Sequence, residues 1–404
     1  MTPIHAKEER ELLPATVTPR HYDLTMEPDL TALVYDGQVT IQLDINEAVS
    51  QIVLHATHIE FREALLVLGD DTEPIKVTDF ALNKDSETVT LSLSREAPAN
   101  SKGALTIKFS GTLNDEMVGF YRSSFKDAQG NSKNIATTQF EPTCARRAFP
   151  CFDEPMLKAT FDVTLVVPKE LTALSNMDVK ETIPDASGKV HVRFNTTPLM
   201  STYLLAFIVG EFDYVEAFTS GEHNGRPIKC RVYTQPGDSE KGRFALEVAT
   251  RALEFFAHEF GIAYPLPKLD QVAIPDFEAG AMENWGLVTY RTITLLFDPK
   301  QSRSKAKEYV SYVVCHELAH QWFGNLVTME WWSELWLNEG FATWVGTHAT
   351  NYLFPEWNVW TTFISDDFNR ALQLDSKRSS HPIQVPVPRS SQIMQIFDAI
   401  SYSK

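Results

Sequence analysis

The spacing of hydrophobic residues changes once along this chain of 404 residues, near residue 212. Before that point, hydrophobic and polar residues alternate, which is typical of strands with one buried face. Residues 1–212 are therefore predicted to form an all-β domain, an antiparallel sandwich, with Asp36-Gly37 interpreted as one of its turns. The alternation is clear at Val39, Ile41, Leu43 and Ile45, and again at Leu105, Ile107 and Phe109.

After residue 212, hydrophobic residues recur at every third or fourth position. This spacing predicts three helices, at residues 239–260, 304–323 and 334–352. Gly261 is expected to end the first helix, and Ser333 is expected to cap the start of the third. Residues 213–404 are therefore predicted to form a second domain that contains these helices.

Charge and hydropathy narrow the classes of partner. The chain has 53 acidic and 36 basic residues, a formal net charge of −17, which disfavours nucleic acid and anionic membrane surfaces as partners. The longest apolar run, residues 203–209, is far shorter than the roughly 18 residues of a spanning helix. The first residues lack the apolar segment of a secretory signal, and the four cysteines form no paired spacing. A cytosolic location with reduced thiols is expected.

The predicted helix at residues 304–323 contains the sequence HELAH, from His316 to His320. Side chains four positions apart lie on one face of an α-helix, about 6 Å apart along its axis, so both imidazoles can bind one metal ion. Glu317 lies about 100° around the helix, where its carboxylate can face a water molecule beside that ion. The pattern predicts one catalytic Zn²⁺ per chain, with Glu317 as the general base.

Catalytic zinc usually has three protein ligands, so a third ligand is needed. The extended motif with a third histidine is excluded because Phe323 and Leu326 occupy the positions that require Gly and His. Three acids remain as candidates: Glu330, Glu334 and Glu339. Glu334 is interpreted as a first-turn acid that complements the helix dipole. Glu339 lies on a small apolar helix face without a cation, where a carboxylate is costly unless a positive charge meets it, and we expect it to be the third ligand.

Four stretches together resemble the M1 zinc aminopeptidases, a gluzincin family, especially the cytosolic puromycin-sensitive type and the fungal alanyl/arginyl enzymes. They are TQFEPTCARRAFPCFDEP, GAMENWG, HELAHQWFGNL and WWSELWLNEGFA, and the resemblance runs from about residue 19 to the last residue. It implies a saddle-like β domain followed by a thermolysin-like α+β catalytic domain. Members of the family continue for several hundred residues with a helical C-terminal region. The chain is therefore expected to be an N-terminal portion whose catalytic domain is incomplete.

The resemblance also implies how a peptide with a free N-terminus would bind. Glu283 would bind the α-ammonium group and Glu141 would share it, which restricts cleavage to the first peptide bond. Gln139 would line the pocket for the first residue, and small residues in the GAMEN stretch would pair with the substrate backbone. The implied substrate-binding residues are Gln139, Glu141, Gly280, Ala281, Met282, Glu283 and Asn284.

Two further positions follow from the resemblance. The stretch ISYSK matches a short SY-x-K stretch of the family and implies that the hydroxyl of Tyr402 donates to the oxyanion of the tetrahedral intermediate. Cys144 departs from the family, which usually has Asp there, so packing and reactivity at this position stay open. A second metal site at Cys144 and Cys151 is disfavoured because no paired ligand spacing accompanies them.

The predicted function is zinc-dependent hydrolysis of the N-terminal residue from peptides. Two alternatives stay open. One is a truncated chain that binds zinc or peptide with little turnover, and the other is a bifunctional epoxide hydrolase and aminopeptidase of the same superfamily. The TQFEPT and ARRAFPCFDEP stretches favour the peptidase over the epoxide hydrolase.

Overall fold

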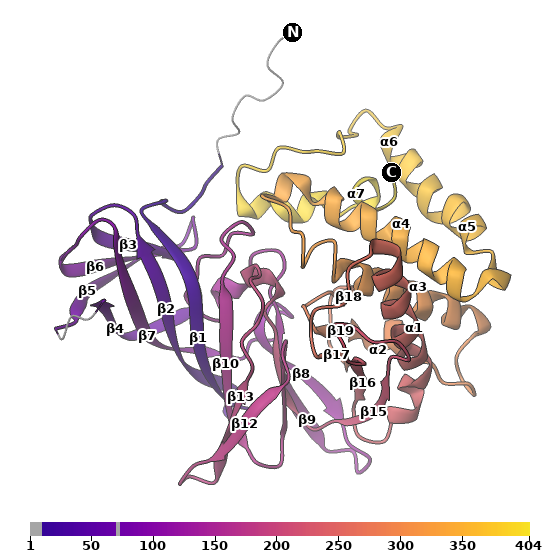
Figure 1. Ribbon diagram of the computed structural model, residues 1–404, viewed down its shortest axis with the longest axis horizontal. Helices are drawn as coiled ribbons and strands as arrows, with labels where there is room; N and C mark the ends of the chain where they lie inside the picture. Colours follow the sequence, from indigo (N-terminus) through magenta and orange to yellow (C-terminus); the bar gives the residue numbers. More distant parts are fainter. Residues whose placement is uncertain (1–9, 70–72) are drawn as a thin grey trace.

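The computed structural model describes residues 10–69 and 73–404 of the chain. A domain of β-sheets occupies one end of the molecule, and most helices gather at the other end (Figure 1). The predicted order, a β domain followed by a domain of mixed helices and strands, is confirmed.

The largest sheet contains ten strands in the order β12, β13, β10, β1, β2, β7, β4, β5, β6 and β3. Their bounds are β1 (Val17–Asp29), β2 (Val34–Ile45), β3 (Val49–His55), β4 (Ile59–Leu68), β5 (Ile75–Asn83), β6 (Thr88–Ala97), β7 (Ser101–Thr112), β10 (Thr160–Pro168), β12 (Val179–Pro184) and β13 (Lys189–Phe194). Neighbours are antiparallel except β1 and β10, which run parallel. Parallel pairing needs a long connection, and most of the β domain separates these two strands.

A second sheet of four strands has the order β11, β14, β9 and β8. Its strands are β8 (Gly119–Lys126), β9 (Ser132–Gln139), β11 (Thr172–Ser175) and β14 (Phe207–Gly210), and short 3₁₀ turns lie at Ala145–Arg147 and Thr202–Leu204. Because β9 ends at Gln139, the chain leaves this sheet at the residues that the resemblance assigned to substrate binding.

The predicted alternation in β2 and β7 is confirmed, since all seven of its hydrophobic residues are buried. The predicted turn at Asp36-Gly37 is wrong, because both residues lie inside β2. Gly37 is needed there for space: a Cβ atom at this position would lie 2.4 Å from the ring of Phe109 on the neighbouring strand β7.

The second domain is built on a five-stranded sheet in the order β15, β16, β17, β19 and β18. The strands are β15 (Asp213–Phe218), β16 (Lys229–Thr234), β17 (Lys268–Ile274), β18 (Ala281–Met282) and β19 (Leu287–Arg291). The helices are α1 (Arg243–Phe260), α2 (Thr292–Leu295), α3 (Ser304–His320), α4 (Trp336–Leu353), α5 (Val359–Thr362), α6 (Asn369–Asp375) and α7 (Ala399–Ser403). Short 3₁₀ turns lie at Ser239–Gly242, Trp332–Glu334, Pro355–Trp357 and Ser390–Ile396, and a π-helical turn lies at Phe363–Phe368. The domain boundary at residues 212 and 213 stays a prediction.

The helix ends differ in part from the prediction. Helix α1 ends at Phe260, and Gly261 follows it with a left-handed φ of 64°, as expected for a glycine at this position. Helix α3 ends at His320 rather than at residue 323. Ser333 does not cap α4, because the 3₁₀ turn that contains it packs the side chain of Trp332 into the core and delays the start of α4 to Trp336.

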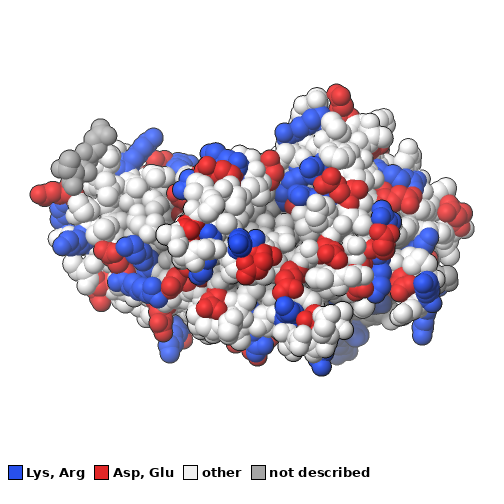
Figure 2. Space-filling model, turned by 90° about the horizontal axis from the view of Figure 1, so that it is seen from below, with Lys and Arg blue, Asp and Glu red and all other residues white. Residues whose placement is uncertain are grey.

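Charged side chains of both signs lie on the surface (Figure 2), and the cysteines are unpaired. On the face in Figure 2, acidic and basic side chains are interspersed. All four cysteines are free, and burial raises the pKa of the Cys144 thiol to about 11, which leaves it protonated and unreactive near neutral pH. Within residues 10–69 and 73–404, no helix is long and apolar enough to cross a membrane.

Candidate metal centre and substrate cavity

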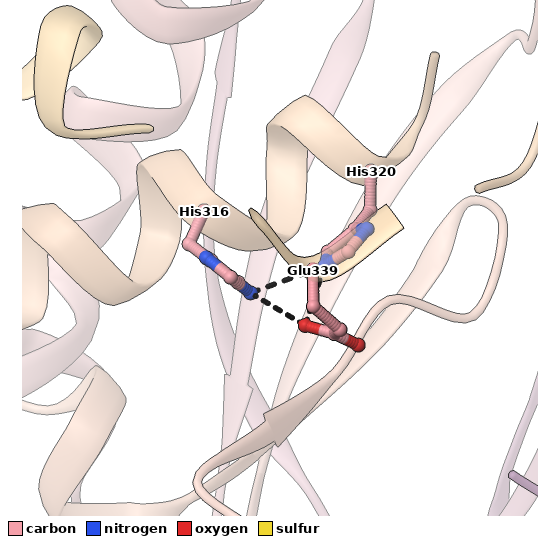
Figure 3. Close-up of side chains that lie close together, drawn as sticks. All are labelled: His316, His320 and Glu339. Atoms are coloured by element: carbon pink, nitrogen blue, oxygen red, sulfur yellow. Dashed lines mark hydrogen bonds and ion pairs between the residues drawn. The ribbon is translucent and has the colours of Figure 1, made fainter. Parts of the chain in front are cut away.

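Helices α3 and α4 lie against each other with unusually close backbones at His316. A Cβ atom at Gly346 would lie 2.9 Å from His316 Cα and 3.0 Å from His316 N, so only glycine fits. Glu339 lies seven residues before Gly346, two turns away on the same face of α4. The close approach therefore brings the Glu339 carboxylate to the two histidines of α3, as Figure 3 shows.

The three side chains converge on one point. His316 Nε2 lies 3.1 Å from His320 Nε2 and 3.4 Å from Glu339 Oε2, and His320 Nε2 lies 3.5 Å from the same oxygen. Ligand atoms about 2.0–2.1 Å from a tetrahedral zinc ion are about 3.3–3.4 Å apart. The donor set of two imidazoles and one carboxylate, and its spacing, thus fit zinc with a fourth position open.

The other ring nitrogen of each histidine also has a neighbour, and for His320 this neighbour sets the tautomer. His320 Nδ1 lies 3.0 Å from the carbonyl oxygen of Phe323, and because a carbonyl only accepts, Nδ1 carries the hydrogen and Nε2 offers its lone pair. This contact depends on the end of α3 at His320, since the chain turns there and directs the Phe323 carbonyl back toward the ring. His316 Nδ1 lies 3.4 Å from Thr343 Oγ1 on α4.

The electrostatics of the triad indicate that a cation belongs there. Burial opposes ionisation of Glu339, but the two histidines outweigh burial and lower its pKa to about 2. Burial also disfavours a charged His320, yet Glu283 and Glu339 outweigh it and raise its pKa, whereas burial lowers the pKa of His316. Without a metal ion, a proton on His320 is the positive charge that these carboxylates attract; a metal ion would replace it.

Three more carboxylates surround the triad, and protonated His320 is the positive group that acts on all three. Each has a buried oxygen atom with no hydrogen-bond partner among the described residues: Glu141 Oε1, Glu283 Oε1 and Glu317 Oε2. Burial raises the pKa of all three, and the negative charges of neighbouring glutamates add to this effect. The carboxylates of Glu141, Glu283 and Glu339 also have oxygen atoms within 4.8 Å of one another. Buried oxygens in this state favour a cationic ligand with several donors.

These groups line one cavity of about 310 Å³. Its walls include residues from both domains, with Gln139 and Glu141 contributed by the β domain. The lining residues are Gln139, Glu141, Pro142, Ala279, Gly280, Ala281, Glu283, Tyr312, Val313, His316, Glu317, His320, Glu339, Met394, Phe397 and Tyr402. The structure therefore brings together ten of the twelve residues that the sequence analysis assigned to the site.

The two exceptions are Met282 and Asn284, which do not line this cavity. Both side chains are buried in the domain interior, and Asn284 Nδ2 donates to Thr289 Oγ1 at 3.1 Å. Strand β18 alternates its side chains, so when Ala281 and Glu283 face the cavity, Met282 between them points the other way.

Tyr402 reaches the cavity from α7. Its ring stacks on the imidazole of His316, and burial together with the surrounding carboxylates raises the pKa of its hydroxyl, so the hydroxyl stays protonated. A protonated phenol beside the ligand triad is a hydrogen-bond donor, as the assignment from the resemblance requires.

The sequence analysis missed Gln321, which ties the GAMEN loop to α3. Its Nε2 donates to the Glu283 carbonyl at 3.0 Å and to the Glu317 carbonyl at 3.2 Å, and its Oε1 accepts from Gly286 N at 3.2 Å. Asn325 Nδ2 also donates to the Glu283 carbonyl, at 2.8 Å. One sequence feature could have identified Gln321 as part of the site. It lies four residues after Glu317, so its amide is on the same face of the helix.

The rival metal ligands lie elsewhere. Glu330 pairs with Arg10 at 3.2 Å, and Glu334 Oε1 accepts from Gln384 Nε2 at 2.9 Å. Cys144 and Cys151 belong to no cluster of three possible ligands within the described residues. The geometry thus favours Glu339 and gives no support to a second metal site at the cysteines.

Comparison with known proteins gives matches to both domains. A sequence model described as the Peptidase M1 N-terminal domain matches residues 18–204, and one described as the Peptidase family M1 domain matches residues 244–404. The chain is 51% identical to the alanine/arginine aminopeptidase of Saccharomyces cerevisiae over 400 residues, covering 98% of this chain and 45% of that protein. It is 49% identical to Aminopeptidase 2 of Candida albicans (98% and 42%) and 50% identical to Aminopeptidase M1-C of Oryza sativa subsp. japonica (97% and 43%). The chain spans less than half the length of each of these relatives.

Proposed function

The chain belongs to peptidase family M1, and from this premise we propose that it carries the active site of a zinc-dependent aminopeptidase, which removes the N-terminal residue from peptides. The proposal is supported by the names of the relatives and by the cavity lined from both domains. A cytosolic location stays a prediction.

In this proposal His316, His320 and Glu339 hold the zinc ion. A bound zinc ion supplies a Lewis acid that polarises the scissile carbonyl and lowers the pKa of water. The fit of three ligand atoms separated by 3.1–3.5 Å supports this assignment.

Glu317 acts as the general base. Its Oε2 is buried in the cavity wall and has no hydrogen-bond partner in the part of the chain that the structure describes, so it is ready to accept a proton from the attacking water. The same carboxyl group then passes that proton to the nitrogen of the leaving peptide, which departs as a neutral amine. Burial raises the pKa of Glu317, which makes its carboxylate a stronger base than an exposed glutamate.

Glu141 and Glu283 anchor the free N-terminus, and the observation that carries this proposal is their pair of unpartnered oxygens in the same cavity as the triad. An α-ammonium group has three donors and one positive charge, which satisfies both oxygens. An internal peptide group has one donor and no charge, so it would leave a buried carboxylate unpaired. This difference restricts cleavage to the first peptide bond.

Tyr402 completes the site as a donor to the oxyanion of the tetrahedral intermediate. A donor that meets charge only as it develops lowers the barrier to reaction rather than strengthening substrate binding. Gln139 contributes to the pocket for the first side chain, and the name of the yeast relative suggests alanine and arginine as the residues to test.

The test measures zinc content and hydrolysis of alanyl and arginyl p-nitroanilides, each with a free and with an acetylated amine. We expect one zinc per chain, loss of turnover on chelation, and turnover of the free amines only. Glu283→Gln should lower kcat/KM for the free amines by about 100-fold, the cost of a lost charge-assisted bond. Glu330→Gln is the matched control, because this exposed acid lies outside the cavity.

Other results separate the alternatives. Zinc binding without turnover of any substrate would favour a chain that binds zinc or peptide, and the segment that the longer relatives possess would then be the missing partner. Turnover of an epoxide substrate would favour the bifunctional class. Full activity in Glu317→Gln would contradict the mechanism.

A further inference from the structure

Helix α7, which carries Tyr402, is capped at its start by the side chain of Asp398. Asp398 is its N-cap: Oδ1 accepts from Ile400 N at 2.9 Å and from Ser401 N at 3.2 Å. The first turn of α7 therefore depends on this carboxylate to satisfy its free backbone N–H groups.

The second oxygen of Asp398 binds a histidine that the proposed mechanism does not use. His381 Nε2 lies 2.7 Å from Asp398 Oδ2, and His381 Nδ1 lies 2.8 Å from the carbonyl oxygen of Pro382. Carboxylate and carbonyl oxygens only accept, so both contacts are satisfied only when both ring nitrogens carry hydrogen. The geometry therefore selects the imidazolium form of His381.

The charges around His381 agree with this form. Burial lowers the pKa of His381, but the Pro382 carbonyl and Asp398 outweigh burial and raise it overall. The other charged groups that face His381 are Asp375 at the end of α6 and Lys404 after α7, and these two pair with each other at 2.7 Å. Their charges largely cancel, which leaves Asp398 as the main electrostatic partner of His381.

The backbone of α7 also contacts the backbone of α4, so a small movement of α7 changes this contact. A Cβ atom at Gly340 would lie 2.9 Å from the carbonyl oxygen of Ser401, so the backbones of α4 and α7 lie in direct contact next to Glu339. Ser401 Oγ also donates to the Ile396 carbonyl at 2.6 Å. Movement of the capped end of α7 is therefore passed to Tyr402, the next residue.

We propose that His381 and Asp398 form a positioning pair, in which a charged histidine fixes the capping carboxylate and thereby holds Tyr402 over His316. The proposal deepens the proposed function, since it rests on the role of Tyr402 as the oxyanion donor. Neither residue touches substrate; both act through α7. A displacement of about 1 Å in a catalytic group can lower a rate by about 100-fold, so this pair controls how well Tyr402 works.

The first test reads the position of Tyr402 without relying on activity. 3-Fluorotyrosine is placed at residue 402 of the full chain, and its ¹⁹F spectrum is recorded at pH 6 with and without His381→Gln. We expect the signal to shift or broaden in the variant. His191→Gln is the matched control, because His191 pairs with Asp185 at 3.5 Å in the β domain and should leave the signal unchanged.

A second variant guards against a folding defect. Asp398→Asn keeps an N-cap acceptor but removes the charge, so α7 can still form while the bond to His381 weakens. We expect it to alter the ¹⁹F signal in the same direction as His381→Gln. If both variants retain the spectrum of the unaltered protein at pH 6, the positioning role is wrong.

Kinetics then separate this inference from the proposed function. His381→Gln should lower kcat about tenfold with little change in KM, and should have no further effect once Tyr402→Phe is present. If Tyr402→Phe leaves kcat unchanged while His381→Gln still moves the ¹⁹F signal, the pair positions Tyr402 but the oxyanion role fails. If Tyr402→Phe lowers kcat and His381→Gln changes neither kcat nor the signal, the positioning pair alone is refuted.

Discussion

The phenol ring of Tyr402 lies nearly parallel to the imidazole of His316, with 15° between the planes and 6.1 Å between the ring centroids. The two residues belong to α7 and α3, helices far apart in the sequence that both pack on α4. Because His316 is one of the three converging residues, this stacking places the tyrosine ring in the wall of the cavity that the triad also lines.

Tyr402→Phe is expected to lower kcat by about 100- to 1,000-fold, since it removes one donor to the developing oxyanion. KM should change little because the lost bond forms mainly in the transition state. The stacked ring is retained, so zinc content should stay at the level of the unaltered protein. Steady-state kinetics with alanyl p-nitroanilide and metal analysis check this.

Tyr352→Phe serves as the control for this change. Tyr352 lies on α4 with 65% of its surface exposed, and loss of its hydroxyl should leave both kcat and zinc content unchanged. A fall in zinc content in Tyr402→Phe would instead point to a structural role of the hydroxyl.

Gln321→Met is expected to destabilise the protein by about 2–4 kcal/mol. The substitution conserves volume, but it removes three hydrogen bonds of a fully buried amide and leaves Gly286 N and the Glu283 carbonyl with fewer partners. The GAMEN loop should also become mobile, which would reduce the preference for free over acetylated amines. Urea unfolding and the two substrate classes measure the two effects, and an unchanged preference would contradict the positioning role.

Glu154 is expected to make stability depend on pH. Its carboxylate accepts from Leu13 N at 2.6 Å, but burial dominates and raises its pKa from 4.5 to about 7. A folded state that favours the protonated acid is most stabilised below pH 4.5, and this stabilisation is lost as pH rises through about 7. The loss amounts to about 3 kcal/mol.

Glu154→Gln should remove this dependence. Between pH 5 and pH 8, the free energy of unfolding measured with urea should fall by about 2.5 kcal/mol more in the unaltered protein than in the variant. An equal change in both proteins would show that Glu154 does not titrate in this range.

The fold could be predicted where one physical signal dominated. Alternation at Val39, Ile41 and Leu43 indicated a strand because a strand with one buried face needs that period. Asp36-Gly37 was wrongly predicted to be a turn because glycine favours turns. Here the glycine lies inside a strand, and the ring of Phe109 on another strand requires it. Such a tertiary contact is not visible in local sequence, and neither is the parallel pairing of β1 with β10.

Much of the site could also be predicted, for different reasons. The spacing of His316 and His320 is a property of a single helix, and Glu339 followed from the cost of an unpaired buried carboxylate. Glu283 and Glu141 depended on the resemblance, because nothing local distinguishes them from loop acids. Gln321 and His381 were missed, since their roles arise from contacts with backbone groups that only the folded chain brings together.

Two glycines of α4 each allow the close approach of a different neighbour. An added Cβ would meet His316 Cα at Gly346 and the Ser401 carbonyl at Gly340, both at 2.9 Å. Gly346→Ala should push α3 away from Glu339 and weaken zinc affinity by at least about tenfold, since ligand geometry is then lost. Gly340→Ala should displace α7 instead, leaving zinc affinity within about twofold but lowering kcat about tenfold.

Alanine favours a helix by about 1 kcal/mol over glycine, so loss of function in either variant would not come from a weaker α4. Gly221→Ala, whose nearest atoms lie 3.9 Å away, is the control for both, and competition with a zinc chelator measures the affinities. Equal zinc affinity in Gly346→Ala and Gly340→Ala would contradict the separate roles of these two contacts.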